Sequence, residues 1–112
     1  MDLNQKIRQY LLYLKQCDEV DAKYNLDATE IKLLNEIATA LLAEDSLTVS
    51  GALALKKIAS PATLHAAMKR LIVKDLILQV PAQDSRTKFL HLSKLGWKRY
   101  AEHANILAAA VK

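Results

Sequence analysis

The stretch SPATLHAAMKRLIV, residues 60–73, constrains the fold more than any other part of the chain. Ser60 is a favoured N-cap residue and Pro61 suits the first position of a helix, so we expect a helix to begin here. The side that faces away from the apolar residues has short or basic side chains and no carboxylate before Asp75. The spacing predicts one buried stripe, formed by Leu64, Met68, Leu71 and Ile72.

A shorter helix is expected just upstream, from about Val49 to Lys57, with Leu53 directed inward. Thr48 or Ser50 can serve as its N-cap. The residues KIAS then make a tight turn into the helix at 61–73. Two short helices joined by such a turn, the second with an exposed basic face, are typical of a helix-turn-helix.

Two apolar runs with β character follow, LILQV at 76–80 and KFLHL at 88–92. The polar residues PAQDSRT lie between them and begin with Pro81, which indicates a hairpin with a loop of about seven residues. A helix-turn-helix followed directly by a hairpin is a winged helix. The predicted fold class is therefore mainly α with a small β-hairpin, a winged helix-turn-helix flanked by N- and C-terminal helices.

Helices are also expected on both sides of this core. The first runs from about Leu3 to Asp18, and the acidic residues 18–26 should end or bend it. Asp27 and Glu30 form a capping-box-like pair that starts the next helix, which should end near Glu44. Apolar residues at spacings of three and four mark a seam on each terminal helix. These are Leu3, Ile7, Tyr10, Leu14 and Cys17 in the first, and Trp97, Tyr100, Ala104, Leu107 and Val111 in the last, which Ser93 caps.

The length of 112 residues is typical of one domain. We therefore predict a single winged-helix domain over 1–112, with an N-terminal dimerisation helix at 1–22. The winged helix-turn-helix core would occupy 27–92, and a C-terminal dimerisation helix would occupy 93–112.

Charge is divided unevenly along the chain. Residues 1–45 hold five Lys or Arg and nine Asp or Glu, a net charge of −4, whereas residues 46–112 hold eleven and three, a net charge of +8. A basic half of this density indicates a polyanionic partner, most commonly nucleic acid. The alternative is the ordinary solvated surface of a basic protein.

Four strings in this order resemble the MarR family of winged-helix transcriptional regulators, from about Leu26 to Tyr100. They are LDATEIKLLNEIA, LTVSGALALKKIASPATLHAAMKRLIVKDLI, QDSRTKFLHLSKLGWKRY and, within the last, LSKLGW. Asp84 and Arg86 stand on the Asp-x-Arg positions of the family's wing. The sequence departs from the family at Asp75, where a glycine is usual, and at Ala66, where a larger polar residue is common. It also has one C-terminal helix in place of a longer dimerisation region.

The resemblance implies a homodimer that binds pseudo-palindromic double-stranded DNA, with helix 61–73 in the major groove and wing 81–88 near the minor groove. Asp84 would hold Arg86 through a salt bridge. The alternative is a winged helix that mediates protein–protein contacts in a larger assembly without binding DNA. The candidate DNA-binding residues are Ser60, Ala62, Thr63, His65, Ala66, Lys69, Arg70, Arg86 and Lys88. The candidate dimerisation residues are Leu3, Ile7, Tyr10, Leu14, Tyr100, Ala104, Leu107 and Val111.

Other chemistry is not expected. His65, His91 and His103 lack Cys or carboxylate neighbours at metal-ligand spacing, and we expect strand or surface roles for them. No Gly-rich phosphate loop or nucleophile elbow is present, so we predict neither an enzyme nor a cofactor, and no effector can be assigned. Trp97 and Tyr100 are expected in the core rather than in a ligand pocket.

Cys17 could be a redox sensor, but its place on an apolar seam beside acidic residues favours an inert, packed thiol. A single cysteine excludes an intrachain disulfide framework and favours a reduced, cytoplasmic protein. No apolar run approaches the roughly 20 residues that span a bilayer, so no membrane association is expected. The first residues also lack the pattern of a secretory signal.

Overall fold

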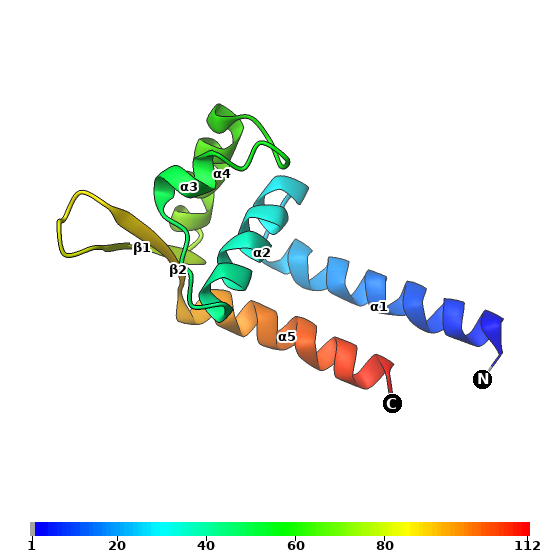
Figure 1. The fold of residues 1–112 in the computed structure, drawn as a ribbon. Helices are drawn as coiled ribbons and strands as arrows, with labels where there is room; N and C mark the ends of the chain where they lie inside the picture. The colour runs from blue at the N-terminus through cyan, green and yellow to red at the C-terminus, as the bar shows by residue number, and fades with distance from the viewer. Residues whose placement is uncertain (1) are drawn as a thin grey trace. The chain divides into compact units, whose positions relative to one another are not determined.

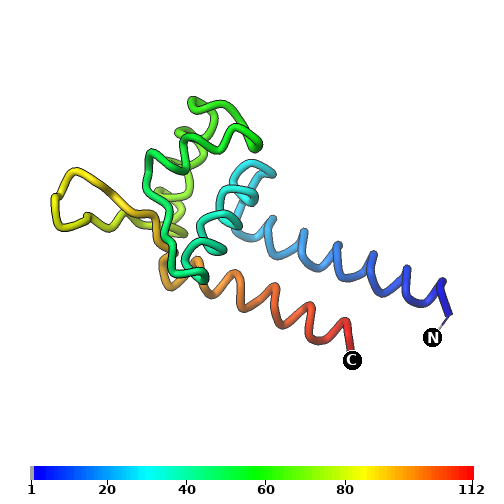
Figure 2. Tube along the Cα trace, viewed as in Figure 1, coloured from blue at the N-terminus to red at the C-terminus, as the bar shows by residue number. Residues whose placement is uncertain are grey.

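The computed structural model describes residues 2–112, which form two compact units. The central unit is Asp27–Gly96, and the terminal unit combines the residues up to Leu26 with Trp97–Lys112. Figures 1 and 2 show the path of the chain. The elements are α1 (Leu3–Lys23), α2 (Ala28–Leu42), α3 (Val49–Leu53), α4 (Pro61–Val73), β1 (Ile77–Pro81), β2 (Lys88–Leu92) and α5 (Lys94–Ala110). This order confirms the predicted fold class.

The core of the central unit lies between α2, α4 and the hairpin. The stripe of α4 that faces this core is Leu64, Ala67, Met68 and Leu71, whereas Ile72 is 37% exposed. The predicted place of Ile72 in the stripe is wrong, because each residue turns about 100° around a helix and Ile72 lies one step beyond Leu71. The large apolar residues that are wholly inaccessible to solvent are Leu33, Leu34 and Ile37 of α2, Leu64 and Leu71 of α4, Leu76 just before β1, and Leu90 of β2.

Side-chain caps begin the helices where the sequence predicts. Asp27 accepts a hydrogen bond from the Glu30 backbone N–H at 2.8 Å, and the Glu30 carboxylate accepts one from the Asp27 N–H at 3.0 Å. Thr48 caps α3 by accepting from the Gly51 N–H at 2.9 Å. Ser60 caps α4 by accepting from the Thr63 N–H at 3.3 Å. Each cap satisfies a backbone donor that the first turn of a helix leaves free.

The hairpin is antiparallel and pairs Ile77 with Leu92 at its base and Pro81 with Lys88 at its tip. The expectation that Pro81 belongs to the loop is wrong, since it ends β1. A two-stranded sheet has only edge strands, which tolerate a proline because one side of each strand needs no hydrogen bond. The connecting loop is therefore 82–87.

A third short segment joins this sheet from before α3. Thr48 forms an isolated β-bridge with Phe89, and the Leu90 N–H donates to the Leu47 carbonyl at 2.8 Å. The start of α3 is thereby attached to β2.

Two helix boundaries differ from prediction. The first helix continues to Lys23 instead of ending near Asp18, because Asp21 is not a solvated breaker but a buried, paired carboxylate. The third helix ends at Leu53 instead of Lys57, where backbone bonds between residues three apart replace the helical pattern. Its buried residue is Ala52, and Leu53 is only half-buried.

At the junction between the hairpin and α5, the backbone at Gly96 packs closely against the backbone at Leu76. Asp75 has φ 60°, the left-handed conformation expected at this glycine-like position. Ser93 Oγ donates to the Asp75 carbonyl at 2.6 Å and accepts from the Gly96 N–H at 3.0 Å, which caps α5. A Cβ on Gly96 would lie 2.3 Å from the Leu76 carbonyl oxygen. Any larger residue would therefore clash with the Leu76 backbone, so glycine is required at this position.

Polar side chains connect α1 and α5 in the terminal unit. Arg99 donates to Asp21 through Nε at 2.9 Å and pairs with it through Nη2 at 2.7 Å, and His103 Nε2 lies 3.0 Å from the same oxygen. The surface role expected of His103 is therefore wrong. Glu102 accepts from Lys23 Nζ at 2.6 Å and from the Tyr24 hydroxyl at 2.7 Å. Burial and the bond to Glu102 raise the pKa of Tyr24 to about 12.

Candidate nucleic-acid interface

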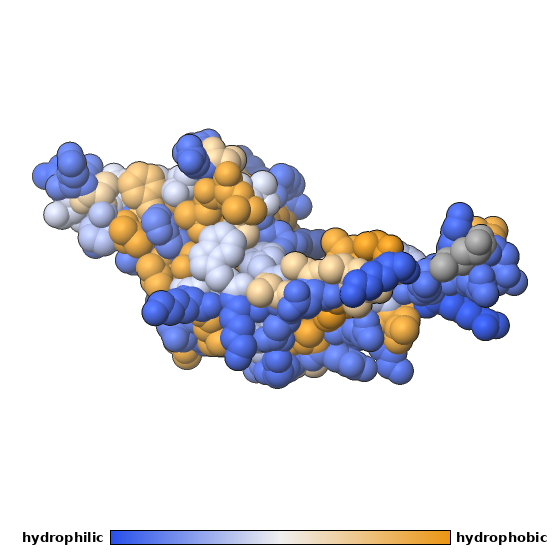
Figure 3. All heavy atoms as spheres, turned by 90° about the horizontal axis from the view of Figure 1, so that it is seen from below, coloured by the Kyte–Doolittle hydropathy of each residue, from blue (hydrophilic) through white to orange (hydrophobic). Residues whose placement is uncertain are grey.

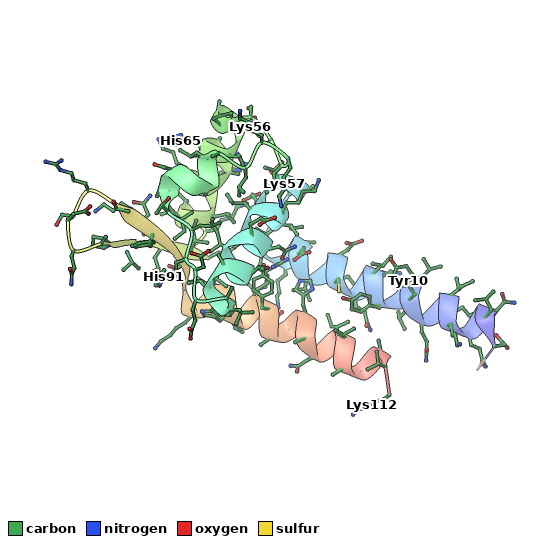
Figure 4. The ribbon with its side chains drawn as sticks, in the orientation of Figure 1. Tyr10, Lys56, Lys57, His65, His91 and Lys112 are labelled. Carbon is green, nitrogen blue, oxygen red and sulfur yellow. The ribbon has the colours of Figure 1, made fainter. Side chains whose placement is uncertain are left out.

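The outer face of α4 is exposed along its length, and every residue predicted there is accessible to solvent. Small side chains and His65 occupy the first two turns, and Lys69 follows on the third turn. Figure 4 labels His65 on this helix. The helix carries no carboxylate. The exposed residues are Ser60, Ala62, Thr63, His65, Ala66, Lys69 and Arg70.

The cations of α4 differ in their partners. Within residues 2–112 Lys69 forms no ion pair, so its ammonium group is available to a ligand. Arg70 Nη2 instead lies 3.1 Å from Asp27, and its Nε lies 3.9 Å from Glu30. The backbone N–H of Glu30, together with Arg70, lowers the pKa of Asp27. Arg70 therefore attaches α4 to the first turn of α2 in this structure.

The loop at 82–87 is shaped by its own backbone. The Ala82 N–H donates to the Thr87 carbonyl at 2.8 Å, and Ser85 has φ 62°. Asp84 accepts from the backbone N–H groups of Thr87 at 3.0 Å and Arg86 at 3.1 Å, and these bonds lower the pKa of Asp84. The predicted salt bridge between Asp84 and Arg86 is wrong, because the carboxylate binds the loop backbone instead. The Arg86 side chain remains exposed.

A groove of about 510 Å³ lies between the start of α3 and the hairpin. Two predicted residues, Arg86 and Lys88, lie on its hairpin side. The sequence did not single out Gln79, and it marked Ser50 only as an alternative helix cap. Leu47 and Val49 have the extended character of strand residues, but the sequence alone does not reveal that this segment pairs with β2. The groove is lined by Thr48, Val49, Ser50, Gln79, Thr87 and the two cations.

Several solved structures are similar to this one in fold. MepR from Staphylococcus aureus in a DNA complex is 23% identical and has a TM-score of 0.71, with 95% of this chain and 85% of that chain covered. MarR from the same organism, in complex with salicylate and kanamycin, is 25% identical with a TM-score of 0.64 and coverage of 95% and 68%. A transcriptional regulator from Thermotoga maritima is 14% identical with a TM-score of 0.70 and coverage of 96% and 74%. The chain has the MarR-type winged-helix fold.

By sequence alone the chain matches no family model and no curated protein. The likeness to MarR-type proteins is therefore structural, and it covers the terminal helices as well as the central unit, since about 95% of this chain is included. Within this fold, α4 is the second helix of the helix-turn-helix, and loop 82–87 joins the two strands of the wing.

The apolar seams of the terminal helices reach the surface. Figure 3 shows apolar side chains among charged ones over these helices, and Figure 4 labels Tyr10 on α1. Trp97 is 40% exposed, so the core position expected of it is wrong. Tyr100 is half-buried, and the other predicted dimerisation residues are exposed. These are Leu3, Ile7, Tyr10, Leu14, Ala104, Leu107 and Val111.

The described residues provide neither a metal cluster nor a membrane-spanning helix. Among residues 2–112, no three His, Cys, Asp or Glu side chains gather as a metal site would require. None of the helices in this range has an apolar stretch long enough to cross a bilayer. Cys17 is half-buried, and its hydrogen bond with Tyr13 raises the pKa of that tyrosine.

Proposed function

We propose that this protein is a sequence-specific regulator of transcription that binds double-stranded DNA as a homodimer. The observation that carries the proposal is the exposed, carboxylate-free outer face of α4. A DNA complex of the structurally similar MepR supports it. This function would also place the protein in the cytoplasm.

Helix α4 would enter the major groove. Ala62 and Ala66 have side chains short enough to let the helix approach the groove floor, and His65 and Lys69 would reach base edges or phosphates. Ser60, Thr63 and Arg70 would contact the DNA backbone from the edges of the face. Arg70 would do so by exchanging its carboxylate partners on α2 for phosphate. Arg86 and Lys88 of the wing would lie near the minor groove.

Dimerisation is supported by the surface of the terminal unit. Leu3 and Val111 are 70% and 74% exposed, and several other large apolar side chains of α1 and α5 accompany them. An apolar groove of about 320 Å³ between the two helices is lined by Tyr10, Tyr13 and Leu107, among others. Monomers rarely expose apolar surface of this kind. A two-fold dimer that pairs these helices would bury it and would set two copies of α4 about one DNA turn apart.

Selection of bound duplexes from a random pool tests the proposal. The expected product has two related half-sites in inverted orientation, with centres about 10 base pairs apart. Failure to retain any duplex, even at low salt, would contradict DNA binding. That result would favour a protein–protein module, for which the apolar surface of the terminal unit would supply the contact site.

A further inference from the structure

We propose that the groove between the start of α3 and the wing holds a phosphodiester group of the DNA backbone. This inference rests on the proposed function and adds Ser50 and Gln79 to the interface. The groove has a volume of about 510 Å³, and both cations that line it, Arg86 and Lys88, come from the hairpin. No carboxylate lines it.

The walls of the groove are fixed by hydrogen bonds. On one side, Thr48 is bridged to Phe89, and the Leu90 N–H donates to the Leu47 carbonyl at 2.8 Å. Thr48 also caps α3 through the Gly51 N–H at 2.9 Å, which orients the turn that carries Ser50. On the other side, the ladder from Ile77 to Pro81 holds Gln79 opposite Leu90. A site with such walls is in place before a ligand arrives.

The polar groups of the groove are available to an anion. In the part of the chain that the structure describes, the side chains of Ser50 and Gln79 form no hydrogen bond, and Arg86 and Lys88 form no ion pair. The nearest carboxylate along the chain is Asp84, and its oxygens accept bonds from its own loop, including one from the Thr87 hydroxyl at 3.3 Å. A hydroxyl, an amide, a guanidinium and an ammonium group therefore remain as donors for phosphate oxygens.

The lining favours a backbone contact over a base contact. Unstacked bases are held most strongly on aromatic side chains, and none lines the groove. Hydroxyl, amide and cationic donors are the groups that position proteins on phosphates without reading sequence. The groove is therefore expected to contribute affinity equally on all sequences, whereas α4 contributes specificity.

Neutralisation of single phosphates tests the inference. A selected duplex is prepared with one uncharged methylphosphonate linkage at each position in turn, and its affinity is measured for the wild type and for Lys88→Gln. The affinity of the wild type should fall about tenfold when one particular linkage in each half-site is neutralised, because a charge-assisted bond is lost there. Lys88→Gln should bind the unmodified duplex about tenfold more weakly and be insensitive at that same linkage. Its salt slope should fall by about 0.9 for each copy.

Two further variants sharpen the test. Ser50→Ala should bind the unmodified duplex more weakly and lose less affinity than the wild type when that linkage is neutralised. Its salt slope should be unchanged, because the substitution removes a neutral donor. Lys94→Gln makes the same charge change beyond the base of the hairpin and should keep the wild-type pattern of linkages. If neutralisation of each linkage lowers the affinities of Lys88→Gln and of the wild type by the same factor, the groove is not a phosphate site, although DNA binding stands. A wild type that binds no duplex would overturn both proposals.

Inorganic phosphate separates a DNA site from a site for the free anion. Replacement of chloride by phosphate at constant ionic strength should leave the thermal midpoints of the wild type and Lys88→Gln equally changed. A rise in the midpoint that depends on Lys88 would assign the groove to free phosphate and overturn its assignment to DNA.

Discussion

The Nζ of Lys74 lies 2.6 Å from a carboxylate oxygen of Glu30, whose side chain is only 2% exposed. This pair joins the end of α4 to the start of α2. Lys74→Met should lower the free energy of unfolding by about 2–4 kcal/mol, because the buried carboxylate would keep its bond from the Asp27 N–H but have only the more distant Arg70 as a cation. Denaturant unfolding measures the change. Lys69→Met on the same helix is the control and should stay within about 0.5 kcal/mol of the wild type. Equal effects of the two variants would contradict the role of the pair.

Asp27 should make stability depend on pH. Its pKa is lowered from the ordinary value of 3.8, first by the Glu30 backbone N–H and then by Arg70 among its favourable partners. A lowered pKa means that the charged form contributes stability above the unfolded value, and this contribution disappears as pH falls through the folded value. Asp27→Asn keeps a capping side chain and loses the charge. The substitution should therefore lower the free energy of unfolding by no more than about 1 kcal/mol near pH 7, since solvent screens the half-exposed carboxylate.

The comparison of wild type and Asp27→Asn by unfolding across the pH range checks this. The difference should be constant above about pH 5 and shrink as pH falls through 3.8 and below. Asp45 is an exposed carboxylate without an ion-pair partner in the described range. Asp45→Asn should therefore change the free energy of unfolding by less than Asp27→Asn does. A difference for Asp27→Asn that stays constant down to the lowest pH would contradict the pairing.

Local signals in the sequence predicted most of the fold. The caps at Asp27 and Ser60 are each determined by residues within one turn, so short-range reasoning finds them, whereas the left-handed turn at Asp75 follows from the family resemblance. The exposed face of α4 follows from its spacing in the same way. Asp84 shows the limit of this reasoning, because a carboxylate beside an arginine can bind either its side chain or the loop backbone.

The features that sequence reasoning missed depend on contacts between distant residues. The pairing of Asp21 with Arg99 joins positions far apart in the chain, and it converts an apparent helix breaker into a buried helical residue. Gly96 is required by the Leu76 carbonyl, which only the folded chain brings near. The groove likewise depends on the bridge from Thr48 to Phe89. Periodicity describes single elements and does not give these pairings.

A charge on either apolar seam should split the proposed dimer. Leu14 and Leu107 are 38% and 50% exposed on α1 and α5. Leu14→Glu or Leu107→Glu would place a charge in the buried interface, and sedimentation equilibrium at micromolar concentration should change from dimer to monomer. Asn105→Glu adds the same charge at an exposed polar position of α5 and should leave the dimer intact. A wild type that sediments as a monomer throughout this range would contradict the dimer.

Arg86→Ala tests the wing. The side chain is exposed on a loop whose backbone is held by Asp84, so its removal should leave the thermal midpoint unchanged. Binding to a selected duplex should weaken by about 1–3 kcal/mol. Arg8→Ala removes the same cation from an exposed position on α1 and serves as the matched control. Equal affinities for Arg86→Ala and the wild type at physiological salt would remove the wing from the interface.

The affinity of Lys69→Glu for a selected duplex, measured over a range of salt concentrations, tests the role of α4 most directly. Lys69 is exposed and forms no ion pair in the described part of the chain, so the variant should fold with a nearly unchanged thermal midpoint. Lys32→Glu, an equal charge reversal at an exposed position on α2, controls for net charge. We predict that Lys69→Glu abolishes detectable binding and that Lys32→Glu retains it. Binding by Lys69→Glu as tight as that of Lys32→Glu would contradict the assignment of α4 to the DNA.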